Sequence, residues 1–364
     1  MKRLYLCLLV LVLLAPVAMA ARAPLKANSA DPYVSALVID AESGKTLFEA
    51  NADAMVYPAS VLKLMNLYVI LDRIEQGALR LDDMVQVTPE ASKIGGSQVY
   101  LDPKEQFSVE ELIYALMVQS ANDASVALAI HIAGSKDAFV DMMNRKAQEL
   151  GMKNTRFHSV HGLPPSQGQQ PDVTTARDFA ILCRELAKRP EALKFTGTQT
   201  RGFREDKFIM HNHNKLLTRV SGCDGFKTGY YEAAGFSIAA TARKGGVRII
   251  ALVMGSKDRK VRDAKAAELL ATGFRLVPPQ PEPAATPKPE IPAPPASNAA
   301  AGPESVEQQK PGIAPASGEH DSGWNKFFLG LGAGFLLCLG FFVIARILRK
   351  NSISDIRSKY MDMD

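Results

Sequence analysis

The sequence predicts an α+β domain, because strand-like segments lie at both ends of a region whose middle is helical. A β-hairpin is indicated over residues 36–48, and three strand-like runs occupy residues 225–229, 236–241 and 247–253. The stretch between these two groups shows mainly helical periodicity. We therefore expect the first strands to complete a sheet that the last strands build, with the helices packed beside it.

The individual elements follow from local signals. The hairpin strands, Ala36–Ile39 and Thr46–Phe48, are separated by a turn that contains Gly44. A capping-box pattern over Thr175–Asp178 predicts that another helix begins there. The remaining helices are expected from apolar periodicity that ends at polar or glycine residues, and they cover residues 60–71, 109–118, 123–132, 137–150 and about 263–274.

Length and composition exclude several classes of protein. The chain has 364 residues, 47% of them apolar, and a net charge of +5 that is not gathered into a patch, so we expect no nucleic-acid partner. The six histidines form no His-Glu-x-x-His pattern, which argues against a metallopeptidase, and we expect neither a metal nor a cofactor. Of the four cysteines, only Cys183 and Cys223 lie in the predicted domain, where they either pair or remain free thiols.

Both ends of the chain have the composition of targeting or anchoring segments. Residues 1–20 combine Lys2 and Arg3, an apolar stretch and a small-residue cleavage site, as in a secretory signal peptide. Residues 327–345 are apolar and uncharged, and a helix of that length spans about 28 Å, close to a bilayer core. We therefore expect a transmembrane helix over residues 324–348.

These segments predict how the chain lies in a membrane. Basic residues follow the apolar run, so the tail at 349–364 is expected in the cytoplasm and the domain at 30–277 outside it. Residues 278–323 form a proline-rich linker, since 12 of the 22 prolines lie between Pro278 and Pro315. Such a spacer reaches roughly 140 Å when fully extended. The expected topology is a single-pass membrane protein whose domain lies outside the cytoplasm, tethered by its C-terminal helix.

Three short motifs carry the chemical signal. The first is Ser60-x-x-Lys63, at the start of a helix that is apolar nearly all round. A lysine on such a helix is costly to bury unless it is needed, although Ser60 could also be a helix cap and Lys63 could extend to solvent. The second is Ser120-Ala121-Asn122, between two helices, and the third is Lys227-Thr228-Gly229, on a strand. Each motif alone is weak, but the set in this order is specific.

With these three motifs the sequence resembles the low-molecular-mass D-alanyl-D-alanine carboxypeptidases, which are penicillin-binding serine acyl-enzymes of the β-lactamase/transpeptidase-like superfamily. The resemblance covers about residues 30–277. It implies an antiparallel sheet with a helical subdomain and no cofactor. The matching blocks are Tyr57–Ser60, Gln119–Ala124, His161–Leu163, Thr175–Asp178 and Asp224–Gly229.

The resemblance also implies a role for each motif residue. Ser60 becomes the acyl-ester nucleophile and Lys63 its general base, which requires a neutral amine; burial, the helix N-terminus and the nearby Lys227 all lower a lysine pKa. Ser120 relays a proton to the leaving amine, and Asn122 orients Lys63 and the substrate amide.

Substrate binding is expected at the third motif and beyond it. Lys227, Thr228 and Gly229 anchor the substrate, and the backbone N–H groups of Ser60 and Tyr230 form an oxyanion hole. Arg262 matches the position of an arginine that binds the substrate's free carboxylate, although it could also be an ordinary solvated charge.

The sequence thus predicts a serine D-Ala-D-Ala carboxypeptidase that acts on peptidoglycan stem peptides, supports cell-wall biogenesis and cell shape, and is acylated by β-lactams. Leu62 stands where many relatives have threonine, but it points about 100° away from Lys63 on a helix. The alternatives are a D,D-endopeptidase, a β-lactamase, or a catalytically idle peptidoglycan-binding scaffold. The sequence lacks the Glu-x-x-Leu-Asn pattern by which class A β-lactamases deacylate, which disfavours that alternative.

Overall fold

The computed structural model describes residues 31–280, which lie within the first of two compact units of the chain, Met1–Pro287. The signal peptide predicted at 1–20, the transmembrane helix at 324–348, the tail at 349–364 and nearly all of the linker fall outside the described residues. Among residues 31–280, no helix is both long enough and apolar enough to cross a membrane.

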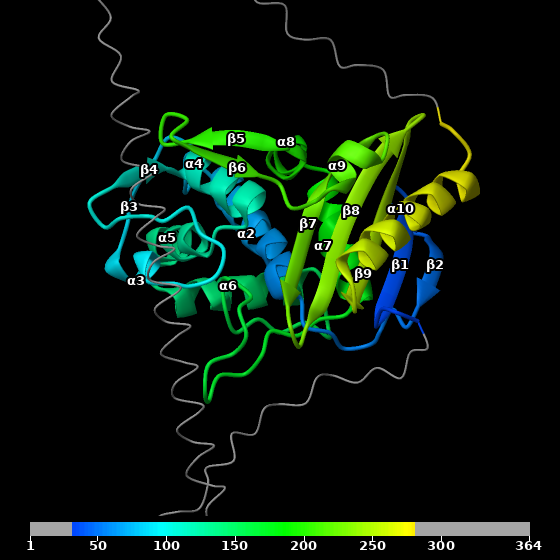
Figure 1. Ribbon diagram of the computed structural model, residues 1–364, viewed down its shortest axis with the longest axis horizontal. Helices are drawn as coiled ribbons and strands as arrows, with labels where there is room; N and C mark the ends of the chain where they lie inside the picture. Colours follow the sequence, from blue (N-terminus) through cyan, green and yellow to red (C-terminus); the bar gives the residue numbers. More distant parts are fainter. Residues whose placement is uncertain (1–30, 281–364) are drawn as a thin grey trace, which may run out of the picture. The chain divides into compact units, whose positions relative to one another are not determined.

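The domain contains a five-stranded antiparallel sheet with the strand order β2-β1-β9-β8-β7 (Figure 1). The two strands of the hairpin near the N-terminus therefore lie beside the last strands of the domain, as the sequence predicts. In register, Val38 of β1 faces Ala251 of β9. The strands are β1 (Ser35–Asp40), β2 (Thr46–Ala50), β7 (Cys223–Tyr231), β8 (Gly235–Lys244) and β9 (Val247–Ser256).

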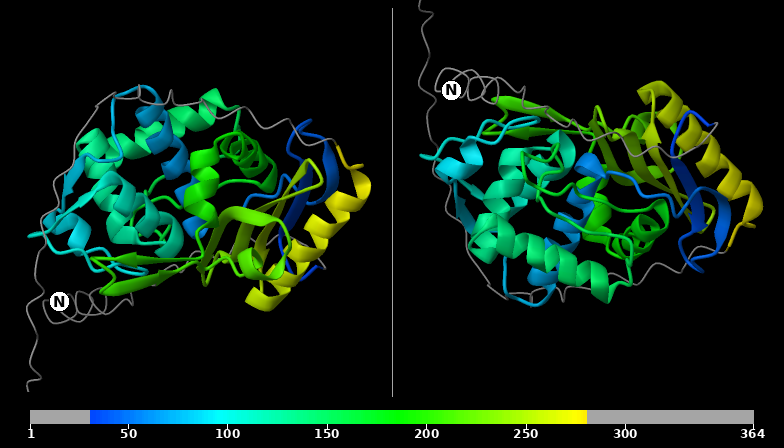
Figure 2. Two further views of the ribbon diagram at one scale, coloured as in Figure 1. Left: turned by 90° about the horizontal axis from the view of Figure 1, so that it is seen from above. Right: turned by 90° about the horizontal axis from the view of Figure 1, so that it is seen from below.

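The two faces of this sheet contact different layers. Along β9, Ile249, Ala251 and Val253 join one apolar cluster while Ile250 and Leu252 join another, as the period of two in a strand requires. Helix α10 (Arg259–Leu276) covers the first face, and both views of Figure 2 show it on the outer side of the sheet, away from the helical part. The second face packs against α7 (Ala176–Ala187).

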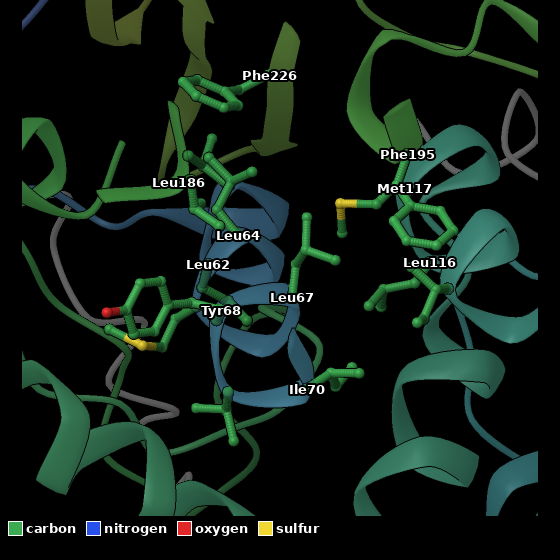
Figure 3. Packing of buried hydrophobic residues seen from close by; sticks show 14 of the residues in the cluster. Leu62, Leu64, Leu67, Tyr68, Ile70, Leu116, Met117, Leu186, Phe195 and Phe226 are labelled. Carbon is green, nitrogen blue, oxygen red and sulfur yellow. The ribbon is translucent and has the colours of Figure 1, made fainter. Parts of the chain in front are cut away.

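The helical part is built around α2 (Lys63–Glu75), which follows the 3₁₀ turn η1 (Ala59–Leu62). Every residue from Lys63 to Leu71 is buried, which fits the nearly unbroken apolar sequence. Figure 3 shows Leu67 and Ile70 of α2 facing Leu116 and Met117 across this core. The other helices are α3 (Pro89–Ser92), α4 (Val109–Tyr114), the π-helical η2 (Ala115–Gln119), α5 (Asn122–Ala133), α6 (Lys136–Glu149), α8 (Pro190–Gly197) and α9 (Leu216–Arg219).

Several details differ from the sequence prediction. The helix expected at 109–118 changes from α to π at Ala115. The last helix begins at Arg259 rather than Asp263, because the Asp258 carboxylate caps it by accepting from two backbone N–H groups. Thr175 caps α7 as predicted, but the Asp178 carboxylate accepts from Asn154 and Thr155 instead of closing a capping box.

The sequence analysis did not predict several short elements, because three or four residues carry no periodic signal. They are the two-stranded ladders β3 (Met84–Gln86) with β4 (Gln106–Ser108) and β5 (Thr200–Phe203) with β6 (Phe208–His211), together with α3 and α9. The eight-residue helix α8 was also not predicted. The two cysteines of the domain, which the sequence left open, are both free thiols: Cys183 is buried and Cys223 is half-buried.

The burial of α2 predicts a large loss of stability when its core face is truncated. Leu67 is fully buried, and Leu67→Ala is expected to lower the free energy of unfolding by about 2–5 kcal/mol through lost burial and a cavity. Met84→Ala is the control, because Met84 is 54% exposed and surface changes cost about 0.5 kcal/mol or less. Denaturant unfolding measures both, and equal losses in the two variants would contradict the packing of α2.

Candidate active site

The Ser60–Lys63 motif lies where the 3₁₀ turn η1 passes into α2. Pro58, not Ser60, is the N-cap of η1, and no side-chain cap bond forms at either helix start. The interpretation of Ser60 as a helix cap is therefore wrong. Ser60 is half-buried at the surface of the site, whereas Lys63 is fully buried.

Lys63 does not extend to solvent; its amine lies within hydrogen-bond distance of three oxygen atoms. Nζ lies 3.1 Å from Ser60 Oγ, 2.8 Å from Asn122 Oδ1 and 2.7 Å from the backbone O of His161. A neutral amine donates two hydrogens and accepts with its lone pair. The amide and carbonyl oxygens can only accept, so they take the two N–H donors and leave the lone pair for the Ser60 hydroxyl.

The surroundings of Lys63 favour that neutral form. Complete burial lowers the pKa of Lys63 well below its usual value, and the positive charge of Lys227 lowers it further. The carboxylates of Asp172 and Asp123 oppose the shift. Desolvation and Lys227 outweigh these two anions, so the pair of Ser60 and Lys63 has the form of an activated nucleophile and its base.

The Ser120–Asn122 turn brings the second motif to Lys63. Ser120 has a φ of 61°, a left-handed conformation that costs energy for a residue with a side chain, and it ends the π-helical turn η2. Asn122 begins α5; its Nδ2 donates to the backbone O of Gly95 at 2.8 Å while its Oδ1 accepts from Lys63. The next residue, Asp123, accepts from the backbone N–H groups of Val99 and Leu101. Residues 95–101 thus hold this turn against the base.

Strand β7 brings the third motif against the nucleophile. A Cβ atom on Gly229 would lie 2.7 Å from the backbone O of Pro58 and 2.9 Å from the backbone N of Ser60, closer than real contacts allow. Only glycine permits this approach. A Cβ on Gly162 would lie 2.3 Å from the backbone O of Ala59. The turn that carries Ser60 is therefore in close backbone contact with both β7 and the His161–Gly162 loop.

The side chains next to Gly229 form a cationic, polar wall. Lys227 and Thr228 are buried, and Lys227 Nζ donates to the backbone O of Thr228 at 3.1 Å. Burial and the charge of Arg262 lower the pKa of Lys227 to about 7. Tyr230 is exposed and stacks on Phe236, with ring centroids 4.0 Å apart.

Arg262 is buried at 2% exposure, so the alternative interpretation as a solvated charge is wrong. Its Nε and Nη2 both donate to Asp263 Oδ1, at 2.9 and 2.6 Å, and Nη1 reaches the backbone O of Ser237 at 3.4 Å. Ser237 of β8 pairs with Gly229 of β7. This pairing places Arg262 beside the part of β7 that contacts Ser60.

Four further residues belong to the site, and the sequence analysis gave none of them a role. His161, which lies in one of the matching blocks, supplies its backbone carbonyl to Lys63, and its imidazole Nδ1 accepts from the N–H of Leu163. His213 is an exposed residue near the cluster of cations, and partial desolvation and the charges of Lys227 and other cations lower its pKa. The buried Asn212 and Asn214 fix the turn on either side of it, bonding to Thr196 and Gly225. These contacts span many residues, so no local pattern indicates them.

Of the nine residues expected from the sequence, Ser60, Lys63, Asn122 and Gly229 meet at η1. Lys227 and Thr228 are buried beside Gly229 on β7, and Arg262 reaches Ser237, the register partner of Gly229. Ser120 ends the turn that precedes Asn122, and the side chain of Tyr230 is exposed. In residues 31–280, no three or more His, Cys, Asp or Glu side chains are grouped to hold a metal ion. The chemistry that the arrangement supports is acyl transfer by a serine with a neutral lysine base.

Comparisons with known proteins agree with this geometry. Residues 19–258 match the profile of peptidase family S11, D-alanyl-D-alanine carboxypeptidase. The carboxypeptidase DacF of Bacillus subtilis is 38% identical over 243 residues, covering 66% of this chain and 61% of DacF. DacC of Escherichia coli is 37% identical over 274 residues, covering 73% of this chain and 67% of DacC.

A solved structure extends the likeness to the fold. Penicillin-binding protein D2 of Listeria monocytogenes, with ampicillin bound, shares 29% identity at a TM-score of 0.61, over 68% of this chain and all of that one. The chain spans about three fifths of the length of DacF. With the family profile over most of its length and the three motifs in one site, the chain belongs to the S11 family of D-alanyl-D-alanine carboxypeptidases.

Proposed function

We propose that the protein is a serine D-Ala-D-Ala carboxypeptidase that removes the terminal D-alanine from peptidoglycan pentapeptides through a Ser60 acyl-enzyme. The observation that carries the proposal is the contact of 3.1 Å between Lys63 Nζ and Ser60 Oγ, made by a fully buried amine whose other two acceptors leave its lone pair for the serine. Membership of the S11 family supports the same activity.

In the proposed reaction, acylation uses these groups in turn. Lys63 takes the proton of Ser60 as Oγ attacks the carbonyl carbon of the penultimate D-alanine. The negative charge on the carbonyl oxygen is stabilised by the backbone N–H groups of Ser60 and Tyr230. The C–N bond breaks as Ser120 gives its proton to the leaving nitrogen and takes in its place the proton held by Lys63, so that D-alanine departs, Lys63 is neutral again and the ester remains on Ser60. A water molecule then attacks the ester while Lys63 accepts a proton from it, and Lys63 returns this proton to Ser60 Oγ as the ester bond breaks.

Substrate recognition rests on the cations around β7. Lys227, Thr228 and Gly229 bind the peptide along the strand, and Arg262 binds its terminal carboxylate, for which a guanidinium fork is suited. Buried cations bind an anion more strongly than solvated ones, because water screens them less. An arginine that binds a terminal carboxylate near the catalytic strand pair favours a carboxypeptidase over an endopeptidase. An endopeptidase cuts its substrate at a bond that is not followed directly by the terminal residue.

The same proposal includes an interaction with β-lactams and a location. The Listeria relative has been solved with ampicillin and with cefotaxime bound, which supports acylation of Ser60 by β-lactams here. For the location, the composition of residues 1–20 and 324–348 supports export followed by anchoring in the inner membrane. The linker at 278–323 then lets the domain reach peptidoglycan at a distance from the membrane.

Ser60→Ala is expected to abolish the release of D-alanine from a D-Ala-D-Ala pentapeptide and to abolish covalent labelling by a fluorescent penicillin, because no other nucleophile replaces Oγ. Ser166→Ala is the matched control, since Ser166 is exposed in a loop, and it should leave both signals unchanged. Release by the Ser60 variant would refute the acyl-enzyme. Labelling and D-alanine release assign a carboxypeptidase; labelling with penicillin hydrolysis alone would assign a β-lactamase.

The protonation states predict a pH dependence. Lys63 must be neutral, so acylation rises as pH increases through its lowered pKa. Lys227 must be charged to bind an anionic substrate, so kcat/KM falls as pH rises past its pKa of about 7. Lys227→Arg keeps the charge at all working pH values, and the descending limb should move above pH 9. The measurement is kcat/KM from pH 5 to 10, with the exposed Lys215→Arg as control; an unmoved limb in Lys227→Arg would exclude Lys227 as its origin.

Arg262→Ala is expected to raise KM for the pentapeptide by about tenfold or more, because a charge-assisted fork to the carboxylate is lost. β-Lactam acylation should slow far less. Arg259→Ala tests whether the effect is specific, since Arg259 lies on the same helix but is exposed. Equal losses toward the two kinds of ligand would remove the carboxylate-binding role of Arg262.

A further inference from the structure

Arg262 is almost completely enclosed, yet it is bonded along only one of its two donor edges. A guanidinium has five N–H donors, arranged as a side-on fork of Nε and one Nη and an end-on fork of the two Nη atoms. Here the side-on fork is taken: Nε and Nη2 both donate to Oδ1 of Asp263, at 2.9 and 2.6 Å. The end-on edge has only a long contact, from Nη1 to the backbone O of Ser237 at 3.4 Å.

Asp263 forms a buried ion pair with Arg262. The side chains of the pair are 3% and 8% exposed, so solvent screens their interaction little. The two residues are neighbours in the first turns of α10, whose start is fixed by the Asp258 cap. Helix α10 therefore fixes the positions of both partners of the ion pair. The Asp263 carboxylate fixes the orientation of the guanidinium plane.

Nη1, one of the two nitrogens of the end-on fork, reaches the catalytic strand pair. Nη1 approaches Ser237 of β8, and Ser237 is the register partner of Gly229. Gly229 in turn touches the backbone of Ser60. An anion bound to the end-on fork thus lies beside the strand that holds the scissile peptide.

We propose that Asp263 is a positioning residue that holds the side-on edge of Arg262 and thereby presents only the end-on fork to the substrate's terminal carboxylate. This inference rests on the proposed carboxypeptidase activity and deepens it, because it assigns the selection of acid-terminated peptides to the Arg262–Asp263 pair rather than to the arginine alone. Asp263 also offsets one of the cations, so the net charge of Lys227, Arg262 and Asp263 together is +1 when Lys227 is protonated.

The orientation and the charge of Asp263 have opposite effects on an anionic ligand, and two substitutions separate them. Asp263→Asn keeps an oxygen that accepts from Nε and Nη2 but removes the negative charge. Asp263→Ala removes both, so the guanidinium regains its rotamer freedom and its side-on donors lose their acceptor. Asp263→Asn is therefore expected to bind the acid-terminated peptide more strongly. Asp263→Ala is expected to bind it more weakly than Asp263→Asn, because the guanidinium is no longer held in one orientation.

The test compares one pentapeptide with a C-terminal carboxylate and the same peptide with a C-terminal amide. The readout is the ratio of kcat/KM for acid over amide, which a reduced folded fraction or a slower acylation step leaves unchanged. We expect the ratio to rise about three- to tenfold in Asp263→Asn, as for the removal of one nearby like charge. In Asp263→Ala it should fall at least about tenfold below the Asp263→Asn value, as for a lost charge-assisted contact.

Two further variants make the outcome unambiguous. Asp224→Asn disrupts another Arg–Asp pair of the same sheet, in which Asp224 binds Arg248 at 2.8 Å, and its ratio should remain that of the unmodified protein. Arg262→Ala should lower the ratio most. Equal ratios in Asp263→Asn and Asp263→Ala overturn the positioning role while leaving the carboxypeptidase intact. An unchanged ratio in Arg262→Ala refutes carboxylate binding by Arg262, and no D-alanine release from the unmodified protein refutes the proposed function itself.

Discussion

The burial of Lys63 is the constraint on which the rest of the site depends. A charged lysine in a dry interior is so unfavourable that the group gives up its proton instead. The three oxygen atoms around Nζ come from η1, from the start of α5 and from the loop at His161. Each must be in place for the amine to be both enclosed and satisfied, so the apolar core around α2 and the base are specified together.

Close backbone approach is the second requirement, and it explains why glycine recurs at the site. The turn with Ser60 is in close backbone contact with both Gly229 and Gly162, and a Cβ at either position would overlap backbone atoms. Backbone cannot move aside as a flexible side chain can. These glycines therefore bring β7 and the His161 loop to van der Waals distance from η1, which a packing of side chains alone would not allow.

The sequence predicted much of this arrangement, and the exceptions have physical causes. Residues with strong local patterns were placed well: the hairpin strands, the last three strands, the buried α2 and the three motifs all lie where expected. The family resemblance, rather than spacing, assigned roles to Ser120 and Arg262. What local pattern could not predict was long-range pairing, such as Lys63 with the carbonyl of His161, 98 positions away. It also missed the earlier start of α10, which decides that Arg262 is enclosed and bonded to Asp263.

The cations of the site also link substrate binding to protonation. Burial, and then the charge of Lys227, lower the pKa of Lys63, and burial, and then the charge of Arg262, lower the pKa of Lys227 to about 7. An entering carboxylate stabilises the charged form of Lys227 and so raises the pKa of that lysine. By linkage, a substrate whose binding favours a proton on Lys227 is bound more tightly when that proton is present. Arg262 stays charged at all working pH values, so the group whose protonation responds to an anionic ligand is Lys227. Under the proposed function, the acid-terminated peptide supplies the charge that keeps Lys227 protonated, and a protonated Lys227 in turn keeps Lys63 neutral as the base for Ser60.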